Sequence, residues 1–279
     1  SIDRVLEFPM TFAPPLAEQR FVLKHIVGLD ALDGDLVDAV LEGAGQIAVE
    51  QWAPLRRIGD VEGARWTPEG VVTPPGFAQA YRDFVAGGWS SIGVPEALGG
   101  QGLPFALQVA VYDMLGSANT ALMLCPILSS GAVEALSHHG SAEQKARYMR
   151  PMIEGRWFGT MCLSEPQAGS SLGDIKTKSV PLPDGTYRIS GNKMWISGGE
   201  HDLSENIVHL VLARIDGAPS GVKGISLFIV PKFLVNDDGS LGARNGVRLA
   251  GLNHKMGCRG TVNTVLNFGE TPCTGYLVG

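Results

Sequence analysis

The chain has 279 residues, of which 44% are hydrophobic and 18% charged, and its formal net charge is −6 at pH 7. This composition is ordinary for a soluble globular protein and gives no sign of collagen, disorder or a disulfide scaffold. The negative charge argues against nucleic-acid binding, which needs clustered Lys and Arg. The cysteines Cys125, Cys162, Cys258 and Cys273 are far apart and form no C-x-x-C pair. We therefore expect reduced thiols and no metal site.

The N-terminus has no basic stretch followed by an apolar core, so a signal peptide is not indicated. From the sequence pattern, we expect no segment of the roughly 20 apolar residues needed to span a membrane. We expect a cytoplasmic protein with neither a membrane nor a nucleic acid as partner.

The first half of the chain has the periodicity of amphipathic helices. From Asp35 to about Trp52, apolar residues recur every three or four positions. A second helix is predicted from Pro75 to a stop at Gly87-Gly88. Segments 104–118, 126–139 and 141–154 repeat the pattern, and the last opens with the capping box Ser141-Ala142-Glu143-Gln144.

Beyond Gly155 the pattern changes to short strands. Tyr187-Arg188-Ile189-Ser190 alternates in polarity and follows the turn Pro183-Asp184-Gly185. Further strands are predicted at 207–213, 225–230 and 262–268. Many short strands separated by turns favour a barrel or sandwich.

The predicted fold class is α+β, with helices first and strands second. We divide the chain into an N-terminal extension (1–34), an all-α helical bundle (35–156) and a β-barrel or β-sandwich domain (157–279). The chain ends at Tyr276-Leu277-Val278-Gly279, directly after a strand. We interpret this end as a truncation that leaves a C-terminal helical domain absent.

Several common site motifs are missing or misleading. The sequence has no P-loop, no G-x-G-x-x-G and no H-E-x-x-H. The stretch Gly99-Gly100-Gln101-Gly102 is better interpreted as a turn, because no Lys-Ser or Lys-Thr follows it. Gly169-Ser170-Ser171-Leu172-Gly173 matches the hydrolase pattern G-x-S-x-G. Pro166 interrupts the approach and no amphipathic helix follows, so a turn is favoured there too. The six histidines form no ligand-like pair and are expected at the surface or in the core.

Five segments, in the same order, resemble those of the acyl-CoA dehydrogenase family. They are 88–102, 161–170 with Ser164-Glu165-Pro166, 191–198 with Lys193-Met194-Trp195-Ile196-Ser197, 224–231, and 255–261. Segments 13–23 and 200–210 resemble those of a subgroup with longer polypeptides, which includes the 3-methylmercaptopropionyl-CoA dehydrogenases.

The resemblance implies FAD as cofactor and an acyl-CoA thioester as substrate, which loses hydrogens from its α and β carbons. It also implies electron-transfer flavoprotein as acceptor and a homo-dimer or tetramer for the full-length protein. The cofactor-binding residues it indicates are Met161, Leu163, Ser164, Trp195, Ile196 and Ser197, and the substrate-binding residue is Ser170. The family usually has Asp after this serine, whereas this chain has Ser171.

No catalytic base can be assigned from the sequence. Glu165 is a candidate, but its place beside Pro166 favours a structural role. In the family the base comes from the C-terminal helical part, so we expect the chain to be inactive alone and to hold FAD poorly. Two alternatives remain open: an acyl-CoA oxidase of the same fold, and a non-catalytic subunit completed by a second polypeptide.

Overall fold

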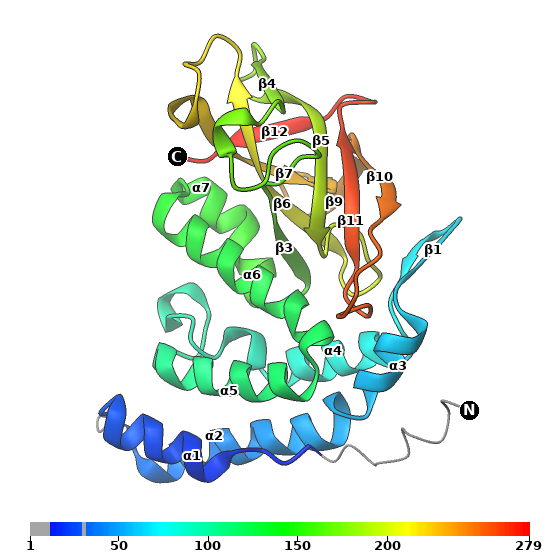
Figure 1. Cartoon of the computed structure of the whole chain (residues 1–279). Helices are drawn as coiled ribbons and strands as arrows, with labels where there is room; N and C mark the ends of the chain where they lie inside the picture. Colours follow the sequence, from blue (N-terminus) through cyan, green and yellow to red (C-terminus); the bar gives the residue numbers. More distant parts are fainter. Residues whose placement is uncertain (1–11, 30–31) are drawn as a thin grey trace, which may run out of the picture.

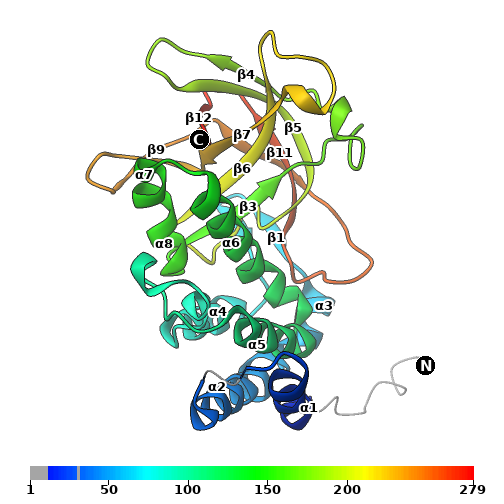
Figure 2. The same ribbon diagram turned by 90° about the vertical axis from the view of Figure 1, so that its left-hand side faces the viewer.

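Helices build the first half of the protein, as the apolar periodicity predicts. The computed structural model describes residues 12–29 and 32–279, so residues 1–11 and 30–31 of the expected extension lie outside the described part. The helices lie below a β-barrel in Figures 1 and 2. They are α1 (Leu16–Phe21), α2 (Gly34–Ile47), α3 (Leu55–Glu62), α4 (Phe77–Ala86), α5 (Phe105–Ala118), α6 (Thr120–His139), α7 (Ala142–Gln144) and α8 (Arg150–Ile153).

Three π-helical turns continue these helices: Val22–Ile26 after α1, Ala48–Trp52 after α2 and Lys145–Met149 between α7 and α8. The capping box predicted at Ser141 and Gln144 is confirmed, with both reciprocal hydrogen bonds present. Helix α1 was not predicted. It is held on the bundle by Gln19, whose Nε2 donates to Ala110 O at 2.9 Å.

The start of α6 differs from the prediction. The apolar periodicity placed its start at residue 126. The helix begins instead at Thr120, where the Asn119 side chain accepts a hydrogen bond from Leu122 N, and Pro126 lies inside it. At 20 residues, α6 is long and apolar enough to cross a membrane by length and composition, contrary to the expectation from sequence. It packs against α5 and the strand β3 (Trp157–Cys162), as a core helix does.

The strands of the second half are β3 (Trp157–Cys162), β4 (Lys178–Pro181), β5 (Tyr187–Ser197), β6 (Asn206–Ile215), β7 (Ile225–Pro231), β8 (Phe233–Val235), β9 (Leu241–Arg244), β10 (Val247–Leu252), β11 (Asn263–Phe268) and β12 (Thr274–Leu277). Strands β4, β5, β12, β7 and β6 pair in a closed ring, because β4 bonds to both β5 and β6. Strand β3 pairs parallel with β6 outside this ring. Strand β11 pairs antiparallel with the second half of β5, and β10 pairs antiparallel with β11. No C-terminal helical domain follows β12 within the described residues.

A short hairpin inside the helical half was not predicted. Strands β1 (Arg65–Thr67) and β2 (Gly70–Val72) pair antiparallel. Val71 is buried in the same apolar cluster as the barrel residues Ile189 and Val211. The hairpin therefore ties the helical half to the barrel.

The close contact between α6 and β3 depends on Gly159. A Cβ at this position would lie 2.4 Å from Ala132 Cβ and 3.0 Å from Met152 Sδ. The bare backbone lets Ser129 Oγ of α6 accept a hydrogen bond from Gly159 N at 3.0 Å. This contact fixes β3, and hence the turn that follows it, relative to the helices.

Candidate functional site

The turn after β3 is held against the end of β5. Met194 N donates to Ser164 O at 2.9 Å, and Lys193 Nζ donates to Leu163 O at 3.0 Å. Thr160 Oγ1 of β3 also donates to Ser197 O at 2.7 Å. Main-chain and side-chain hydrogen bonds thus join residues 160–164 to residues 193–197, about thirty positions later in the sequence.

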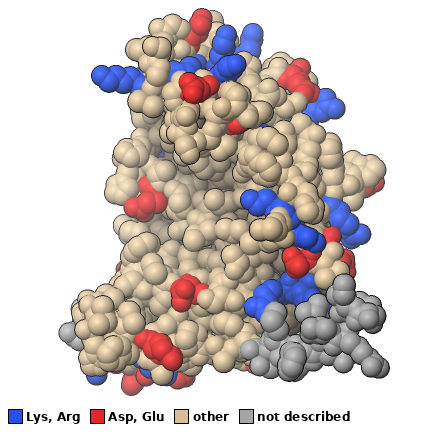
Figure 3. Space-filling model, in the orientation of Figure 1, with Lys and Arg blue, Asp and Glu red and all other residues tan. Residues whose placement is uncertain are grey.

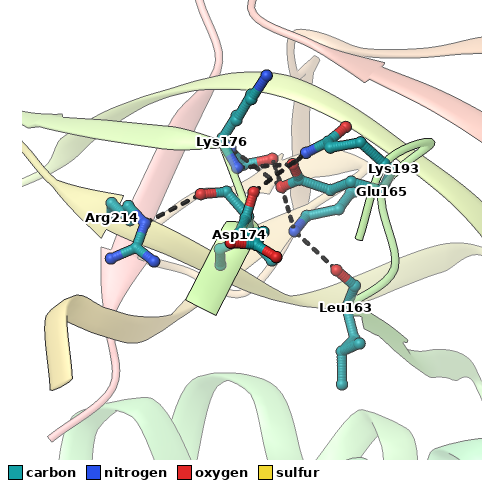
Figure 4. A network of polar contacts seen from close by, with 9 residues as sticks. Leu163, Glu165, Asp174, Lys176, Lys193 and Arg214 are labelled. Carbon is teal, nitrogen blue, oxygen red and sulfur yellow. Dashed lines mark hydrogen bonds and ion pairs between the residues drawn. The ribbon is translucent and has the colours of Figure 1, made fainter. Parts of the chain in front are cut away.

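A buried ion pair anchors this turn (Figure 4). Lys193 Nζ lies 2.9 Å from Glu165 Oε1, and the two side chains are 0% and 3% exposed. The next segment supplies three more donors to the carboxylate: Thr177 Oγ1 at 2.5 Å, Lys176 N at 2.7 Å and Thr177 N at 3.0 Å. Gln167 Nε2 donates to the same carboxylate at 2.6 Å. Burying a charge is costly unless it is paired and hydrogen-bonded, and Glu165 meets both conditions.

The ionisation of Glu165 follows from these donors. Burial alone would raise its pKa, but the hydrogen bonds from Thr177, Lys176 and Lys193 lower the pKa to about 2. Burial lowers the pKa of Lys193, and the adjacent carboxylate opposes that shift. A carboxylate with so low a pKa and so many donors is a poor proton acceptor near neutral pH, which supports the structural role predicted for Glu165.

Arg214 of β6 organises the loop that contains Ser170. Its Nε donates to Ile175 O at 2.9 Å, and its Nη1 donates to Gly221 O at 2.8 Å. Its Nη2 donates to Gly173 O. The loop is followed by a single 3₁₀ turn, Leu172–Asp174, and no helix. The nucleophile elbow of a hydrolase is therefore absent, and Ser170 lies exposed on a braced loop.

Trp195, near the end of β5 and beside the Leu163–Ser164 turn, has an unusual backbone conformation. Its φ is +64°, a left-handed conformation that costs free energy in any residue except glycine and is retained mainly where the surroundings impose it. Its side chain is 49% exposed, and Lys255 Nζ lies 5.5 Å from its ring centroid. The ring is thus a half-exposed aromatic surface at the end of a strand, with the Lys255 ammonium over one of its faces.

The predicted cofactor-binding residues differ in exposure. Met161 and Trp195 are 42% and 49% exposed, and Leu163, Ser164 and Ser197 are half-buried. Ile196 is 2% exposed and belongs to the barrel core together with Cys162. Its side chain stabilises the strand, which leaves only its main chain to face a ligand.

The groups at the site are mostly uncharged, apart from Lys255 at the Trp195 ring and the buried Glu165–Lys193 pair. Figure 3 shows that much of the face it presents, between the barrel and the helices, is also uncharged. Among residues 12–29 and 32–279, no group of three His, Cys, Asp or Glu side chains could hold a metal ion. The site offers hydroxyls, main-chain groups and an aromatic face, which suit a flat heteroaromatic ligand.

Sequence reasoning missed the roles of Lys193 and Arg214. The alternation of β5 carries a signal for the first, because Lys193 takes the inward position that Ile189 takes four residues earlier. A lysine at an inward position predicts a buried counter-ion. No comparable signal identifies Arg214, whose partners are main-chain carbonyls of two loops.

A second cluster of ionisable groups centres on the buried Glu200, in the loop between β5 and β6. Glu200 pairs with Lys232 and with Arg244, the latter at 2.7 Å. Next to it, burial lowers the pKa of His201 and of His209 to about 3. Both histidines are therefore neutral near pH 7. They are core residues, as predicted for part of the histidines, but within the described part of the chain only Nδ1 of each has a polar partner and Nε2 has none.

Comparisons with known proteins identify the family of this chain. Residues 49–156 match the N-terminal domain of acyl-CoA dehydrogenases, and residues 160–270 match the middle domain. The chain is 45% identical over 279 residues to 3-methylmercaptopropionyl-CoA dehydrogenase of Ruegeria pomeroyi, covering 97% of this chain and 47% of that protein. It is 36% identical over 250 residues to a butyryl-CoA dehydrogenase of Syntrophomonas wolfei, covering 88% of this chain and 41% of that protein.

A solved acyl-CoA dehydrogenase from Bacillus anthracis, complexed with FAD, shares the fold. Its TM-score is 0.69 at 20% identity, over 90% of this chain and 38% of that chain. The chain thus spans less than half the length of these relatives.

Proposed function

Because the chain belongs to the acyl-CoA dehydrogenase family, we propose that the full protein catalyses FAD-dependent α,β-dehydrogenation of an acyl-CoA thioester. One observation carries the proposal: the Leu163–Ser164 turn is locked against the strand end that presents Trp195 and Ser197. This arrangement gathers main-chain groups, hydroxyls and an aromatic ring in one place.

The residues present fit a flavin. An isoalloxazine ring is flat and apolar on its faces and carries hydrogen-bond acceptors along its edge. The half-exposed ring of Trp195 suits a face, and the half-buried Leu163, Ser164 and Ser197 suit the edge. When bound, FAD supplies the redox chemistry by accepting a hydride from the β carbon of the substrate.

The chain's own residues would bind and orient the flavin and the substrate and would exclude water from them. Donors at Leu163, Ser164 and Ser197 would stabilise the electron density that the ring gains on reduction. Met161 fills space beside the ring, and Ser170 on its braced loop binds the CoA part of the substrate. The Glu165–Lys193 pair holds these donors in place and does not take a substrate proton.

The base that removes the α proton lies outside these residues, as the family resemblance implies. We accordingly expect the 279-residue chain to be inactive alone and to bind FAD weakly. The longer polypeptide would assemble as a homo-oligomer and pass its electrons to electron-transfer flavoprotein. The names of the two relatives suggest a short acyl chain, such as 3-methylmercaptopropionyl or butyryl.

The test uses the longest polypeptide that the gene encodes, purified and titrated with FAD. We expect a yellow protein whose flavin absorbance bleaches without oxygen when 3-methylmercaptopropionyl-CoA or butyryl-CoA is added. Slow reoxidation in air supports a dehydrogenase, and fast reoxidation supports the oxidase alternative. A folded full-length protein that refuses FAD would overturn the proposal.

A further inference from the structure

The hydroxyl of Ser197 has a side-chain partner from a different strand. Asn263 begins β11 directly opposite Ser197, the last residue of β5. Asn263 Nδ2 donates to Ser197 Oγ at 3.1 Å. Asn263 is only 6% exposed, so this amide is part of the structured interior and not a mobile surface group.

A second asparagine fixes the direction of that amide. Asn253 Nδ2 donates to Asn263 Oδ1 at 2.9 Å, and Asn253 N donates to Asn263 O at 2.8 Å. If the Asn263 amide were turned over, its NH₂ group would face the NH₂ group of Asn253. The favourable arrangement leaves Asn263 only a donor to offer to Ser197.

This arrangement decides what Ser197 can do. A serine hydroxyl has one hydrogen to donate and two lone pairs that accept. Ser197 Oγ accepts a hydrogen bond from Asn263 through one lone pair. Its own hydrogen has no acceptor among residues 12–29 and 32–279. The hydroxyl is therefore held by its oxygen while its hydrogen stays available to a ligand.

We propose that Asn253 and Asn263 act as positioning residues that hold Ser197 as a hydrogen-bond donor to the flavin edge. The proposal rests on the proposed function, because it requires a flavin at this face. It also explains how a serine at position 197 can hold its hydroxyl in one orientation. A β-branched threonine restricts its own hydroxyl rotamer, whereas serine lacks the methyl group that does so. The amide of Asn263 supplies that restriction from the neighbouring strand.

The test is a double-mutant cycle in the full-length holoenzyme, read by the FAD dissociation constant and the flavin midpoint potential. Asn263→Ala should weaken FAD binding about five- to tenfold, the effect of losing one oriented hydrogen bond. It should also shift the midpoint potential. In a Ser197→Ala background the same substitution should have little further effect, because the hydroxyl it orients is gone.

A rescue separates positioning from simple structural support. In a Ser197→Thr background, Asn263→Ala should weaken FAD binding less, since threonine limits its own rotamers. Asn267→Ala is the matched control, because Asn267 lies on the same strand and is not in this chain of amides. It should leave both readouts unchanged.

Asn253→Ala provides a second route if Asn263→Ala fails to fold, and it should reproduce the loss of FAD affinity in part. Equal effects of the Asn263 substitution with and without the Ser197 hydroxyl would overturn the inference. So would a normal dissociation constant and potential in variants of a wild-type protein that binds FAD. A wild-type protein that binds no flavin would instead overturn the proposed function, and this inference with it.

Discussion

The substitution Lys193→Met tests how much the buried ion pair supports the site. It removes the ammonium that lies 2.9 Å from Glu165 Oε1 and 3.0 Å from Leu163 O, in a side chain with no exposed surface. Glu165 then keeps its charge in the interior without its counter-ion. Breaking a buried pair in this way costs about 3–5 kcal/mol. At about 2–4 °C per kcal/mol for a chain of this size, the melting temperature should fall by about 6–20 °C.

The assay is thermal unfolding followed by circular dichroism, with FAD affinity measured at a temperature where the variant is folded. We expect weaker FAD binding as well, because the Leu163–Ser164 turn loses its anchor. Lys178→Met is the matched control, since Lys178 is exposed on β4, and it should change stability by less than about 0.5 kcal/mol. The double variant Glu165→Gln with Lys193→Met should recover part of the stability, because it leaves no unpaired charge. An unchanged melting temperature for Lys193→Met alone would refute the reasoning.

Three further predictions concern the ring, the domain contact and pH. Trp195→Ala should weaken FAD binding about 3- to 10-fold in fluorescence titrations, while the melting temperature changes less than in Lys193→Met, because the ring is half-exposed. Gly159→Ala should destabilise by about 1–3 kcal/mol in urea unfolding, since its Cβ would overlap Ala132, whereas Gly169→Ala, with open space around it, should be neutral. The pKa values of His201 and His209 are lowered from 6.5 to about 3, so the unfolded chain binds more protons between these limits. Stability should thus be fully present above pH 6.5 and fall as the pH drops toward 3, and a melting temperature that is flat over this window would contradict the assignment.

Much of the fold was accessible from local pattern. Helices α2, α4, α5 and the segment α7–α8 follow from apolar spacing, and the capping box at Ser141 uses residues three positions apart. Helix α3 (Leu55–Glu62) was not predicted. The start of α6 was mistaken because Pro126 and the Asn119 cap give competing local signals. The hairpin β1–β2 was missed because its strands have three residues each, too short for an alternating pattern to stand out.

By itself, the sequence determined the order of helices and strands and the segments that resemble a flavin-binding domain. These depend on neighbours a few residues apart, or on short runs that can be matched directly. Only the tertiary structure decided which groups meet at the site. Lys193 reaches Glu165 and Leu163, and Asn263 reaches Ser197, because strands distant in the sequence pair in one register. A side chain's partner across a sheet depends on that register and on close packing, and neither is encoded in any single segment.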